Sequence, residues 1–302
     1  MKNLIYDVLI IGAGPAGLTA GIYSARNGLK TAVVAKEIGG TANSILRIEN
    51  WPGYSGTGAN LMKQFYEHVK KFEVDFIVSE VMSIKKEKDL FIIKTSKEEL
   101  KSKSIIIAAG TERKRLNIEG EKEFLGKGVS YCSTCDAFFF KNKIVAVVGG
   151  SDCASTTALA LADIAKKVYV IYRGEELKCE IINSKRLEEK SNVEIIYKAF
   201  PIKILGKEKV EEMEILKDKK KEKIKLDGVF IEVGSTPLVE FTKEVGLKLD
   251  SENNIIINEN METSVKGIFA AGDVTNQKLK QVLVASAQGA ITAKSASDWL
   301  KK

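Results

Sequence analysis

What the sequence lacks already excludes several classes of protein. It has one histidine and four cysteines in 302 residues, and cysteines this sparse do not form the disulfide framework of a small secreted domain. Its apolar runs, such as 105–109 and 144–148, have the length of strands and are too short to cross a membrane. It also has no basic stretch interleaved with aromatic residues, which disfavours a nucleic-acid-binding protein.

The composition is that of a globular protein large enough for two domains. Hydrophobic residues make up 44% and charged residues 29% of the chain, as is usual for proteins with a packed core. Only a few residues precede the first predicted strand, and they do not form a signal peptide, so we expect a cytoplasmic protein. The formal net charge of +7 reflects a lysine-rich surface, and it favours acidic protein partners.

Two stretches of the chain repeat one pattern of strand, glycine-rich turn, helix and strand. The first has a strand at 7–11, the turn Gly-Ala-Gly-Pro-Ala-Gly at 12–17, a helix to about Asn27 and a strand at 31–34. The second has a strand at 143–148, the turn Gly-Gly-Ser-Asp-Cys-Ala at 149–154, a helix to about Lys167 and a strand at 168–171. This pattern predicts two βαβ dinucleotide-binding units in one chain.

The two turns differ in their fitness for a dinucleotide. The first glycine of such a turn makes the tight bend, the second lets the backbone approach a pyrophosphate, and the third lets helix and strand pack closely. The first turn has Gly12, Gly14 and Gly17, whereas the second has Ser151 and Ala154 at the last two places. The Ser151 side chain would crowd a phosphate, so we expect the second unit to keep the fold and to bind a nucleotide poorly.

Six ordered motifs connect the sequence with a known family. They are 12–17, Ile-Glu-Asn-Trp-Pro-Gly at 48–53, Ile-Ala-Ala-Gly at 107–110, Cys-Ser-Thr-Cys-Asp at 132–136, Val-Gly-Gly at 148–150 and Gly-Ile-Phe-Ala-Ala-Gly-Asp-Val at 267–274. With these motifs the chain resembles the low-molecular-weight thioredoxin reductases along nearly its whole length.

The resemblance implies an α/β fold of two Rossmann-like dinucleotide-binding domains, the second inserted into the first. The FAD-binding domain is expected at 1–115 and 240–302, and the pyridine-nucleotide-like domain with the Cys pair at 116–239. Glycines near both crossings suit a hinge. The family pattern also implies a homodimer in which the smaller domain swings between a flavin-facing and a partner-facing position.

The resemblance also implies an FAD site. Gly12, Gly14 and Ala16 would cradle the pyrophosphate, and Asn50 would approach the flavin ring. Gly272 and Asp273 would hold the ribityl and phosphate region, with Gln281 and Val282 near the pyrimidine end of the ring. Further cofactor-binding candidates are Pro15, Glu37 (a partner for a ribose hydroxyl), Gly40, Thr41 (where the family has glutamine), Ala109 and Gly110.

Cys132 and Cys135 have the spacing of a redox-active pair. Disulfide exchange needs one cysteine with a lowered pKa and a second that resolves the mixed disulfide, and Asp136 can serve as proton donor or acceptor. By the family pattern Cys135 faces the flavin and Cys132 attacks the partner's disulfide. Half of a zinc site is the alternative, but a second pair is missing and the single histidine, His68, is distant in sequence. We expect no metal.

The residues expected to bind the electron donor depart further from the family pattern than the rest of the site. NADPH-dependent members carry a His-Arg-Arg-x-x-x-Arg cluster for the 2′-phosphate, whereas 172–178 here reads Tyr-Arg-Gly-Glu-Glu-Leu-Lys. Lys178 cannot make an arginine's bidentate contact, and 175–176 add negative charge. A branch of the family that takes electrons from acidic ferredoxin lacks the same determinants, and this sequence resembles it. We therefore predict electron flow from ferredoxin through FAD and the Cys pair to thioredoxin, with NADPH disfavoured.

Other activities stay open on the sequence alone. The nearest is an NAD(P)H-dependent thioredoxin reductase with an atypical nucleotide site. A ferredoxin–NADP reductase of similar fold would not need the Cys pair, and a non-enzymatic flavin module would bind FAD without thiol turnover. A peroxiredoxin reductase of this family usually carries an extra N-terminal thioredoxin-like unit. Cys153 and Cys179 are interpreted as inert thiols.

Overall fold

The computed structural model describes residues 4–302, so the first three residues of the predicted FAD domain lie outside the described range. The chain divides into two compact units. Unit 1 comprises the residues up to Asn43 together with Ile48–Glu112 and Thr236–Lys302, and unit 2 comprises Ser44–Arg47 and Arg113–Ser235. The two main crossings between the units fall in the short strands β9 (Thr111–Arg113) and β18 (Ser235–Pro237), which pair with each other.

Unit 1 is built on a seven-stranded sheet with the order β5-β2-β1-β8-β7-β6, and β19 pairs with the end of β8. Strands β1, β2, β5, β8 and β19 run parallel, whereas β6 and β7 are antiparallel additions. The strands are β1 (Ile5–Ala13), β2 (Thr31–Ile38), β5 (Val74–Val78), β6 (Val81–Glu87), β7 (Leu90–Thr95), β8 (Glu99–Ile107) and β19 (Ile268–Ala270).

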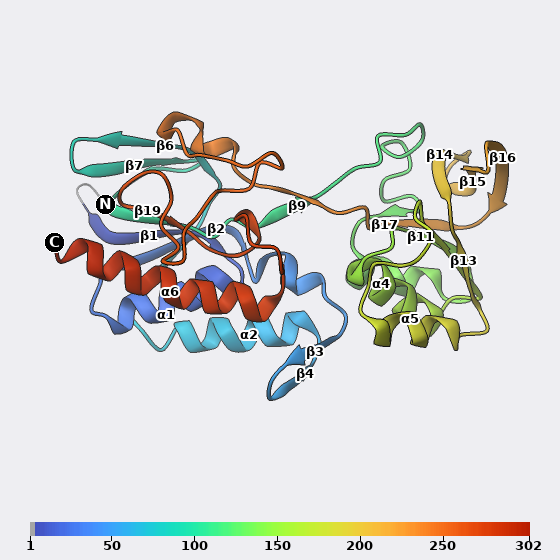
Figure 1. The fold of residues 1–302 in the computed structure, drawn as a ribbon, viewed down its shortest axis with the longest axis horizontal. Helices are drawn as coiled ribbons and strands as arrows, with labels where there is room; N and C mark the ends of the chain where they lie inside the picture. The colour runs from blue at the N-terminus through green and yellow to red at the C-terminus, as the bar shows by residue number, and fades with distance from the viewer. Residues whose placement is uncertain (1–3) are drawn as a thin grey trace. The chain divides into compact units, whose positions relative to one another are not determined.

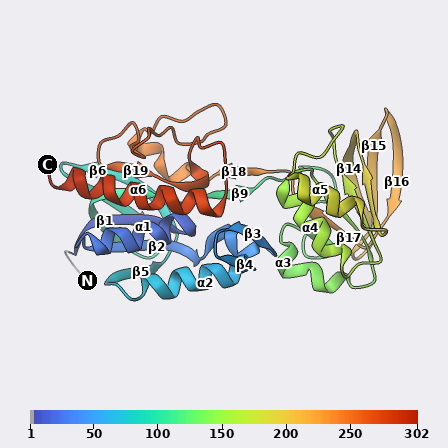
Figure 2. The ribbon, with the colours of Figure 1, turned by 60° about the horizontal axis from the view of Figure 1, so that its bottom comes forward.

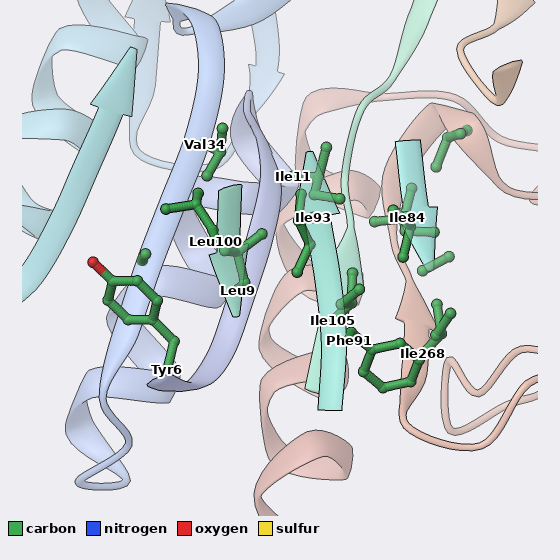
Figure 3. Packing of buried hydrophobic residues seen from close by; sticks show 14 of the residues in the cluster. Tyr6, Leu9, Ile11, Val34, Ile84, Phe91, Ile93, Leu100, Ile105 and Ile268 are labelled. Atoms are coloured by element: carbon green, nitrogen blue, oxygen red, sulfur yellow. The ribbon is translucent and has the colours of Figure 1, made fainter. Parts of the chain in front are cut away.

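Helices cover one face of this sheet, as Figure 1 shows for α1 (Pro15–Arg26), α2 (Gly58–Val69) and α6 (Val282–Leu300). Because side chains alternate along a strand, Val8 and Ile10 pack toward these helices while Leu9 and Ile11 enter the core on the other face. Figure 3 shows this second core, which Phe91 also enters. Burial of both faces explains why the strands are continuous apolar runs.

The shorter elements of unit 1 carry several predicted cofactor residues. They are the 3₁₀ helices η1 (Gly40–Ser44), η3 (Glu240–Val245) and η4 (Gly272–Val274), and the hairpin of β3 (Ile48–Trp51) and β4 (Tyr54–Gly56). The last residue of η1, Ser44, is grouped with unit 2.

Unit 2 contains a five-stranded parallel sheet with the order β10-β17-β11-β12-β13. Its elements are β10 (Val129–Ser130), α3 (Ser133–Asp136), η2 (Ala137–Phe140), β11 (Ile144–Val148), α4 (Asp152–Ala162), β12 (Lys167–Ile171), α5 (Ile181–Glu188), β13 (Val193–Ile196) and β17 (Gly228–Ile231). The antiparallel strands β14 (Ala199–Gly206), β15 (Val210–Lys217) and β16 (Lys220–Lys225) form a separate sheet. Helices α4 and α5 pack on one face of the parallel sheet and the antiparallel sheet packs on the other (Figure 2).

The structure confirms the predicted α/β fold with Rossmann-like parallel sheets. β1-α1-β2 and β11-α4-β12 are the two repeats, and β17 lies beside β11 as β8 lies beside β1. The second helix was predicted too long: α4 ends at Ala162, because Ile164 and Ala165 donate their N–H groups back to Leu161 O and close the helix in a turn.

Candidate functional site

The first glycine turn has a backbone that only glycine fits at its ends. Gly12 has a φ of +110°, and a β-carbon there would approach Ala108 O to 2.1 Å. A β-carbon at Gly17 would lie 1.8 Å from Gly12 O, so the third glycine lets α1 pack on the turn. These contacts are the tight bend and the close helix–strand packing expected from the sequence.

Gly14, the middle glycine, serves a different purpose. It is the N-cap of α1, and the nearest atom to a β-carbon built on it is Gly39 O at 3.9 Å. The space above the turn is therefore open, and the first turn of α1 contains no acidic side chain. The N–H groups of Ala16 and Gly17 have no acceptor within the helix, as in every first helical turn. An open cradle at a helix N-terminus fits a pyrophosphate.

Other predicted FAD residues come together around this cradle. A β-carbon at Gly40 would lie 3.5 Å from Gly14 Cα, and one at Gly272 would lie 3.1 Å from Ala16 Cβ. Gly40 begins η1 and Gly272 begins η4. Two segments that are distant from each other in sequence, η1 and η4, thus converge on the first turn of α1.

Asn50 and Gln281, the two residues expected near the flavin ring, are in direct contact. Asn50 Nδ2 donates to Gln281 Oε1 at 3.0 Å. Asn50 lies in β3 and Gln281 is the N-cap of α6, so the contact joins the hairpin to the last helix. It leaves one edge of unit 1 lined by amide groups of the kind that hydrogen-bond a flavin ring.

Asp273 lies in η4 with its carboxyl largely withdrawn from water. Burial raises the pKa of Asp273, and the Lys280 ammonium opposes this effect. Lys280 Nζ donates to Asp273 O at 2.9 Å and to Asn254 Oδ1 at 2.7 Å. A half-buried carboxyl is stabilised by hydrogen-bond partners, and the hydroxyl groups of a ribityl chain would supply them.

The remaining predicted cofactor residues lie on the same elements. Pro15 is the first residue of α1, Thr41 lies within η1, and Val282 is the first residue of α6. Ala109 Cα lies 3.0 Å from the position of a β-carbon at Gly12, and Gly110 follows it with a φ of +67°. Glu37 is exposed near the end of β2.

Cys132 and Cys135 form a disulfide in unit 2, with their Cα atoms 5.3 Å apart. Cys132 is the N-cap of the short helix α3, and its sulfur accepts a hydrogen bond from Cys135 N at 3.2 Å. The expected start of a helical turn at the pair is therefore present. Both cysteines retain access to solvent, Cys135 more than Cys132.

Ser130, which lies just before the pair in β10, contacts two residues of the motif. Its Oγ lies 2.6 Å from Asp136 Oδ2 and accepts from Cys132 N at 3.0 Å. Asp136 N in turn donates to Cys132 O at 3.1 Å. The carboxylate expected to exchange protons with the Cys pair is thus held in place by a neighbouring hydroxyl.

Tyr131, between Ser130 and Cys132, is anchored on a buried carboxylate. Its hydroxyl donates to Glu121 Oε1, and Glu121, which is 4% exposed, also accepts from the backbone N–H groups of Leu116 and Ile118 at 2.8 and 3.3 Å. Burial and the hydrogen bond to this carboxylate raise the pKa of the Tyr131 phenol.

The second glycine turn repeats the first at its opening residue. Gly149 has a φ of +143°, and a β-carbon there would lie 2.2 Å from Glu232 O, just as Gly12 meets Ala108 O. The following positions differ. The Tyr172 ring lies against Gly150, 2.5 Å from the position of a β-carbon there, and Ser151 is the N-cap of α4.

The N-terminus of α4 is engaged by the protein itself. Asp152, its first residue, accepts Glu180 N at 2.7 Å on Oδ1, and Lys178 N donates to Gly150 O at 2.7 Å. The carboxylate of Asp152 therefore lies at the positive end of the α4 dipole, where a pyrophosphate would bind. Nearby, Glu175 pairs with Lys198 at 2.9 Å, which uses one of the local cations.

Several features lie outside the two sites. Phe140 is buried and packs edge-on against Phe230 at 5.2 Å, whereas Phe138 and Phe139 are exposed. Cys153 is exposed, and burial raises the pKa of the half-buried Cys179. Residues 4–302 contain no cluster of histidine, cysteine and acidic side chains placed to hold a metal ion. In the same range, every helix is too short or too polar to cross a membrane.

Sequence reasoning missed the residues that support the sites from a distance. Gln288 Oε1 accepts Gly272 N at 2.7 Å, and Glu121 and Ser130 support the Cys motif. Ser130 adjoins the motif and a short-range search would find it. Gln288 and Glu121 carry no local signal, because their contacts depend on how α6 and the 116–121 segment fold back.

Comparisons with known proteins agree with this arrangement. Residues 6–289 match the pyridine nucleotide-disulphide oxidoreductase family. Thioredoxin reductase of Bacillus subtilis is 36% identical, with 100% of this chain and 96% of the relative covered. Thioredoxin reductase of Aquifex aeolicus is 40% identical, with 98% and 94% covered.

Solved structures show the same likeness. Thioredoxin reductase of Lactococcus lactis superposes with a TM-score of 0.95 at 34% identity, covering 98% of this chain and 99% of that one. A ferredoxin-flavin thioredoxin reductase of Clostridium acetobutylicum gives a TM-score of 0.53 at 33% identity, with 98% of both chains covered. With its Cys132–Cys135 disulfide and its two βαβ repeats, the chain belongs to the thioredoxin reductases of the pyridine nucleotide-disulphide oxidoreductase family.

Proposed function

We propose that this protein is an FAD-dependent thioredoxin-disulfide reductase that receives electrons from reduced ferredoxin. The Cys132–Cys135 pair passes them to thioredoxin. The observation that carries the donor assignment is the N-terminus of α4, where the backbone N–H groups of Lys178 and Glu180 donate to Gly150 O and Asp152 Oδ1 of the turn that would otherwise hold a pyridine nucleotide.

FAD fits the residues of unit 1. The cradle over Gly14 would hold the pyrophosphate, the half-buried carboxyl of Asp273 the ribityl region, and the Asn50–Gln281 pair the flavin ring. Glu37, at the end of β2, would bind the ribose. When bound, FAD supplies the conversion between single-electron and two-electron transfer.

The second turn lacks what NADPH requires. Ser151 stands where the backbone should approach a phosphate, and Asp152 adds a negative charge at the helix N-terminus. Of the cationic side chains nearby, Lys198 is paired with Glu175, which leaves Arg173 and Lys178 for a 2′-phosphate. Two cations beside Glu175, Glu176 and Asp152 provide little attraction for a dianion.

The charge of the chain supports an acidic protein donor. The net charge is +7, and ferredoxins are small acidic proteins, so electrostatic attraction would speed their encounter. The likeness to a protein described as a ferredoxin-flavin thioredoxin reductase is consistent with this donor. A ferredoxin delivers one electron at a time, so two deliveries reduce one disulfide.

The chemistry at the pair is thiol–disulfide exchange. Two electrons and two protons convert the Cys132–Cys135 disulfide to two thiols. The Cys132 thiolate then attacks the thioredoxin disulfide, forming a mixed disulfide and releasing one thioredoxin sulfur as a thiolate. Cys135 attacks Cys132, which restores the pair and releases reduced thioredoxin.

Asp136 moves the protons of this cycle. Its carboxylate accepts a proton as a thiol becomes a thiolate and returns it to a sulfur as the dithiol forms. Ser130 Oγ, 2.6 Å from Asp136 Oδ2 and hydrogen-bonded to Cys132 N, fixes the carboxylate relative to the pair. Exchange therefore needs no histidine, in agreement with the single distant His68.

An NAD(P)H-dependent thioredoxin reductase is the second candidate. The family to which the chain belongs is described by its pyridine nucleotide, and the βαβ fold of β11, α4 and β12 is retained. In this alternative, α4 would have to release Asp152 from Glu180 when NAD(P)H binds.

The proposal includes a wider setting for the enzyme. We place FAD in a domain of residues 1–115 and 240–302 and the Cys pair in a domain of residues 116–239. We also propose that the enzyme is a cytoplasmic homodimer, the state implied by its resemblance to the family. Sedimentation of the FAD-loaded protein at micromolar concentration tests the dimer, which a monomer mass would refute.

The function is tested by reconstitution under anaerobic conditions. The FAD-loaded enzyme is mixed with reduced ferredoxin and oxidised thioredoxin, and free thioredoxin thiols are counted. We expect two thiols for every two ferredoxins oxidised. The Cys135→Ser variant should retain FAD and form no thioredoxin thiols. Turnover by that variant would contradict the role of the pair, and turnover only with NADPH or NADH would contradict the donor.

A further inference from the structure

A buried carboxylate outside the reactive motif is connected to it by hydrogen bonds. Glu232 follows β17 and is 3% exposed. Its Oε2 pairs with the Arg113 guanidinium, and its Oε1 lies 3.1 Å from Thr157 Oγ1. Thr157, which is 4% exposed in α4, also lies 3.1 Å from Ser133 Oγ. These contacts form a chain of hydrogen bonds, called the Glu232 path, that leads from Arg113 through Glu232 and Thr157 to Ser133. Ser133 is the residue next to Cys132.

The direction of the hydrogen bonds along this path follows from the charge of Glu232. An ionised carboxylate only accepts hydrogen bonds, so Thr157 Oγ1 is the donor to Glu232 Oε1. Thr157 Oγ1 is also the donor toward Ser133 Oγ, so one hydroxyl proton is shared between two acceptors, each at 3.1 Å. Arg113 supplies the opposite charge that a buried carboxylate requires as a partner.

The backbone of Glu232 gives the path a fixed base. Its N–H donates to Val148 O at 2.8 Å, and its carbonyl is the atom that a β-carbon at Gly149 would meet. Arg113 is the last residue of β9, and Glu232 lies just before β18. The carboxylate thus sits beside the paired strands through which the chain enters and leaves unit 2.

Stability alone is a weak explanation for this group. Replacing a buried ion pair by apolar side chains of similar volume is often neutral or stabilising. The short helix α3, of four residues, has the greater need, because so few residues cannot hold a helical turn by themselves. Ser130 holds its last residue, Asp136, and the Glu232 path holds its first, Ser133.

We infer that Glu232 is a positioning residue for the redox pair. It acts through Thr157 and Ser133 and depends on Arg113 for its charge. The geometry of α3, and with it the reactivity of Cys132 and Cys135, is set by this path. The inference rests on the redox role of the pair in the proposed function and is independent of the electron donor.

The test compares Glu232→Gln, Thr157→Val and their double variant after chemical reduction of the FAD-loaded enzyme. The single-turnover rate of exchange with oxidised thioredoxin should fall about tenfold in each, as expected for losing about 1.4 kcal/mol. The pH profile for alkylation of the reduced pair by iodoacetamide should shift as well. The double variant should equal either single variant, because both interrupt one path.

Two controls separate positioning from a general loss of structure. Thr157→Ser keeps the hydroxyl and should retain the wild-type rate and alkylation profile. Glu194→Gln removes an exposed carboxylate paired with Lys167 at 2.8 Å in the same sheet, and should change neither measurement.

Three outcomes would overturn the inference: wild-type exchange in both single variants, additive effects in the double variant, or equal behaviour of Thr157→Ser and Thr157→Val. No ferredoxin or pyridine nucleotide is present in these assays, so a failure of the donor proposal would leave them unaffected. Loss of exchange in Cys132→Ser but not in Glu232→Gln would leave the proposed function standing and refute the inference alone.

Discussion

The two βαβ units of this chain share a backbone and differ in what occupies the N-terminus of their first helix. In unit 1 the turn at Gly12–Gly14 leaves α1 with no acid in its first turn and no atom closer than 3.9 Å to a β-carbon at Gly14. In unit 2, α4 begins with Asp152, whose carboxylate accepts Glu180 N. The first helix begins without an acidic side chain, whereas the second begins with a carboxylate that accepts a hydrogen bond from a neighbouring backbone N–H group.

Under the proposed function, this difference means that the second dinucleotide fold serves as a scaffold for the Cys pair. The opening glycine is equally constrained in both turns, since Gly12 and Gly149 each meet a carbonyl oxygen of the neighbouring segment. That constraint belongs to the fold. The middle position, glycine in one turn and serine in the other, is instead constrained by whether a phosphate must approach the backbone there. In unit 2 the retained scaffold supports the Cys pair, through Ser130 at β10 and Thr157 in α4.

Exchanging the middle residue between the turns should have the largest effect. Gly14 has an ordinary φ of −79°, so Gly14→Ser leaves the backbone unstrained while its side chain enters the cradle. We expect FAD occupancy after purification to fall by about tenfold or more, measured as the flavin-to-protein absorbance ratio. The matched change Ser151→Gly should leave FAD occupancy as it is. An equal loss of FAD occupancy in Gly14→Ser and Ser151→Gly would contradict the difference between the two turns.

Restoring the family's nucleotide-binding residues at the second turn should have the next largest effect. The variant combines Ser151→Gly, Tyr172→His, Gly174→Arg and Lys178→Arg. Tyr172 must change with Gly174, because a β-carbon at Gly174 would lie 2.6 Å from the Tyr172 ring. Two new guanidinium groups should bind the 2′-phosphate, so NADPH should reduce the flavin about tenfold faster than in the parent protein. Stopped-flow absorbance of the flavin measures this rate, and an unchanged rate would show that other features close the site.

Two tyrosines that donate to carboxylates provide a smaller contrast between the units. Tyr6 in unit 1 donates to the exposed Asp75 at 2.9 Å, whereas Tyr131 in unit 2 donates to the buried Glu121. Removing a donor from a buried carboxylate leaves it poorly satisfied, so Tyr131→Phe should cost about 1–3 kcal/mol of stability and Tyr6→Phe less. Urea unfolding of the two variants decides between them, and a larger loss for Tyr6→Phe would contradict the burial argument.

Both tyrosines also predict an alkaline loss of stability. Burial, with the carboxylate partner, raises the pKa of each phenol in the folded protein. The raised pKa values stabilise the folded state below the unfolded pKa of about 10 and no longer do so as pH rises through the folded pKa. The parent should therefore lose stability above about pH 10 more steeply than the double variant Tyr6→Phe, Tyr131→Phe. If the free energy of unfolding fell equally steeply with pH in the parent and in the double variant, the raised pKa values of the two phenols would be contradicted.

The smallest effect concerns the two cysteines outside the pair, both near the second turn. Burial raises the pKa of Cys179, whereas Cys153 is exposed at the start of α4. Because the thiolate is the reactive form, iodoacetamide at pH 8 should label Cys179 about threefold to tenfold more slowly than Cys153. Peptide mass spectrometry measures both rates. Faster labelling of Cys179 would show that the turn at Lys178 opens in solution.

Local patterns were enough to predict the repeats and the reactive pair. The glycine turns, the apolar strands on either side and the Cys-x-x-Cys spacing act over a few residues, and β1-α1-β2, β11-α4-β12 and the disulfide all appear where the pattern placed them. The end of α4 was wrong by about a turn, because nothing in its composition marks the stop at Ala162.

The supporting contacts were beyond the reach of the sequence for a physical reason. Glu232 and Thr157 are joined across β17 and α4, and Asn50 meets Gln281 from opposite ends of the chain. Each pair depends on the packing of whole elements, which a local pattern does not encode. For the same reason the sequence showed Asp152 only as a helix-starting residue, without its partner Glu180.

Under the proposed function, the second glycine turn does not bind a pyridine nucleotide productively. The most direct test is anaerobic stopped-flow absorbance of the FAD-loaded enzyme mixed with NADPH, then with NADH, and then with reduced ferredoxin. We expect the flavin absorbance to stay unchanged with both nucleotides and to bleach with reduced ferredoxin. Rapid bleaching by either nucleotide would contradict this expectation, and would show that α4 releases Asp152 to admit the ligand.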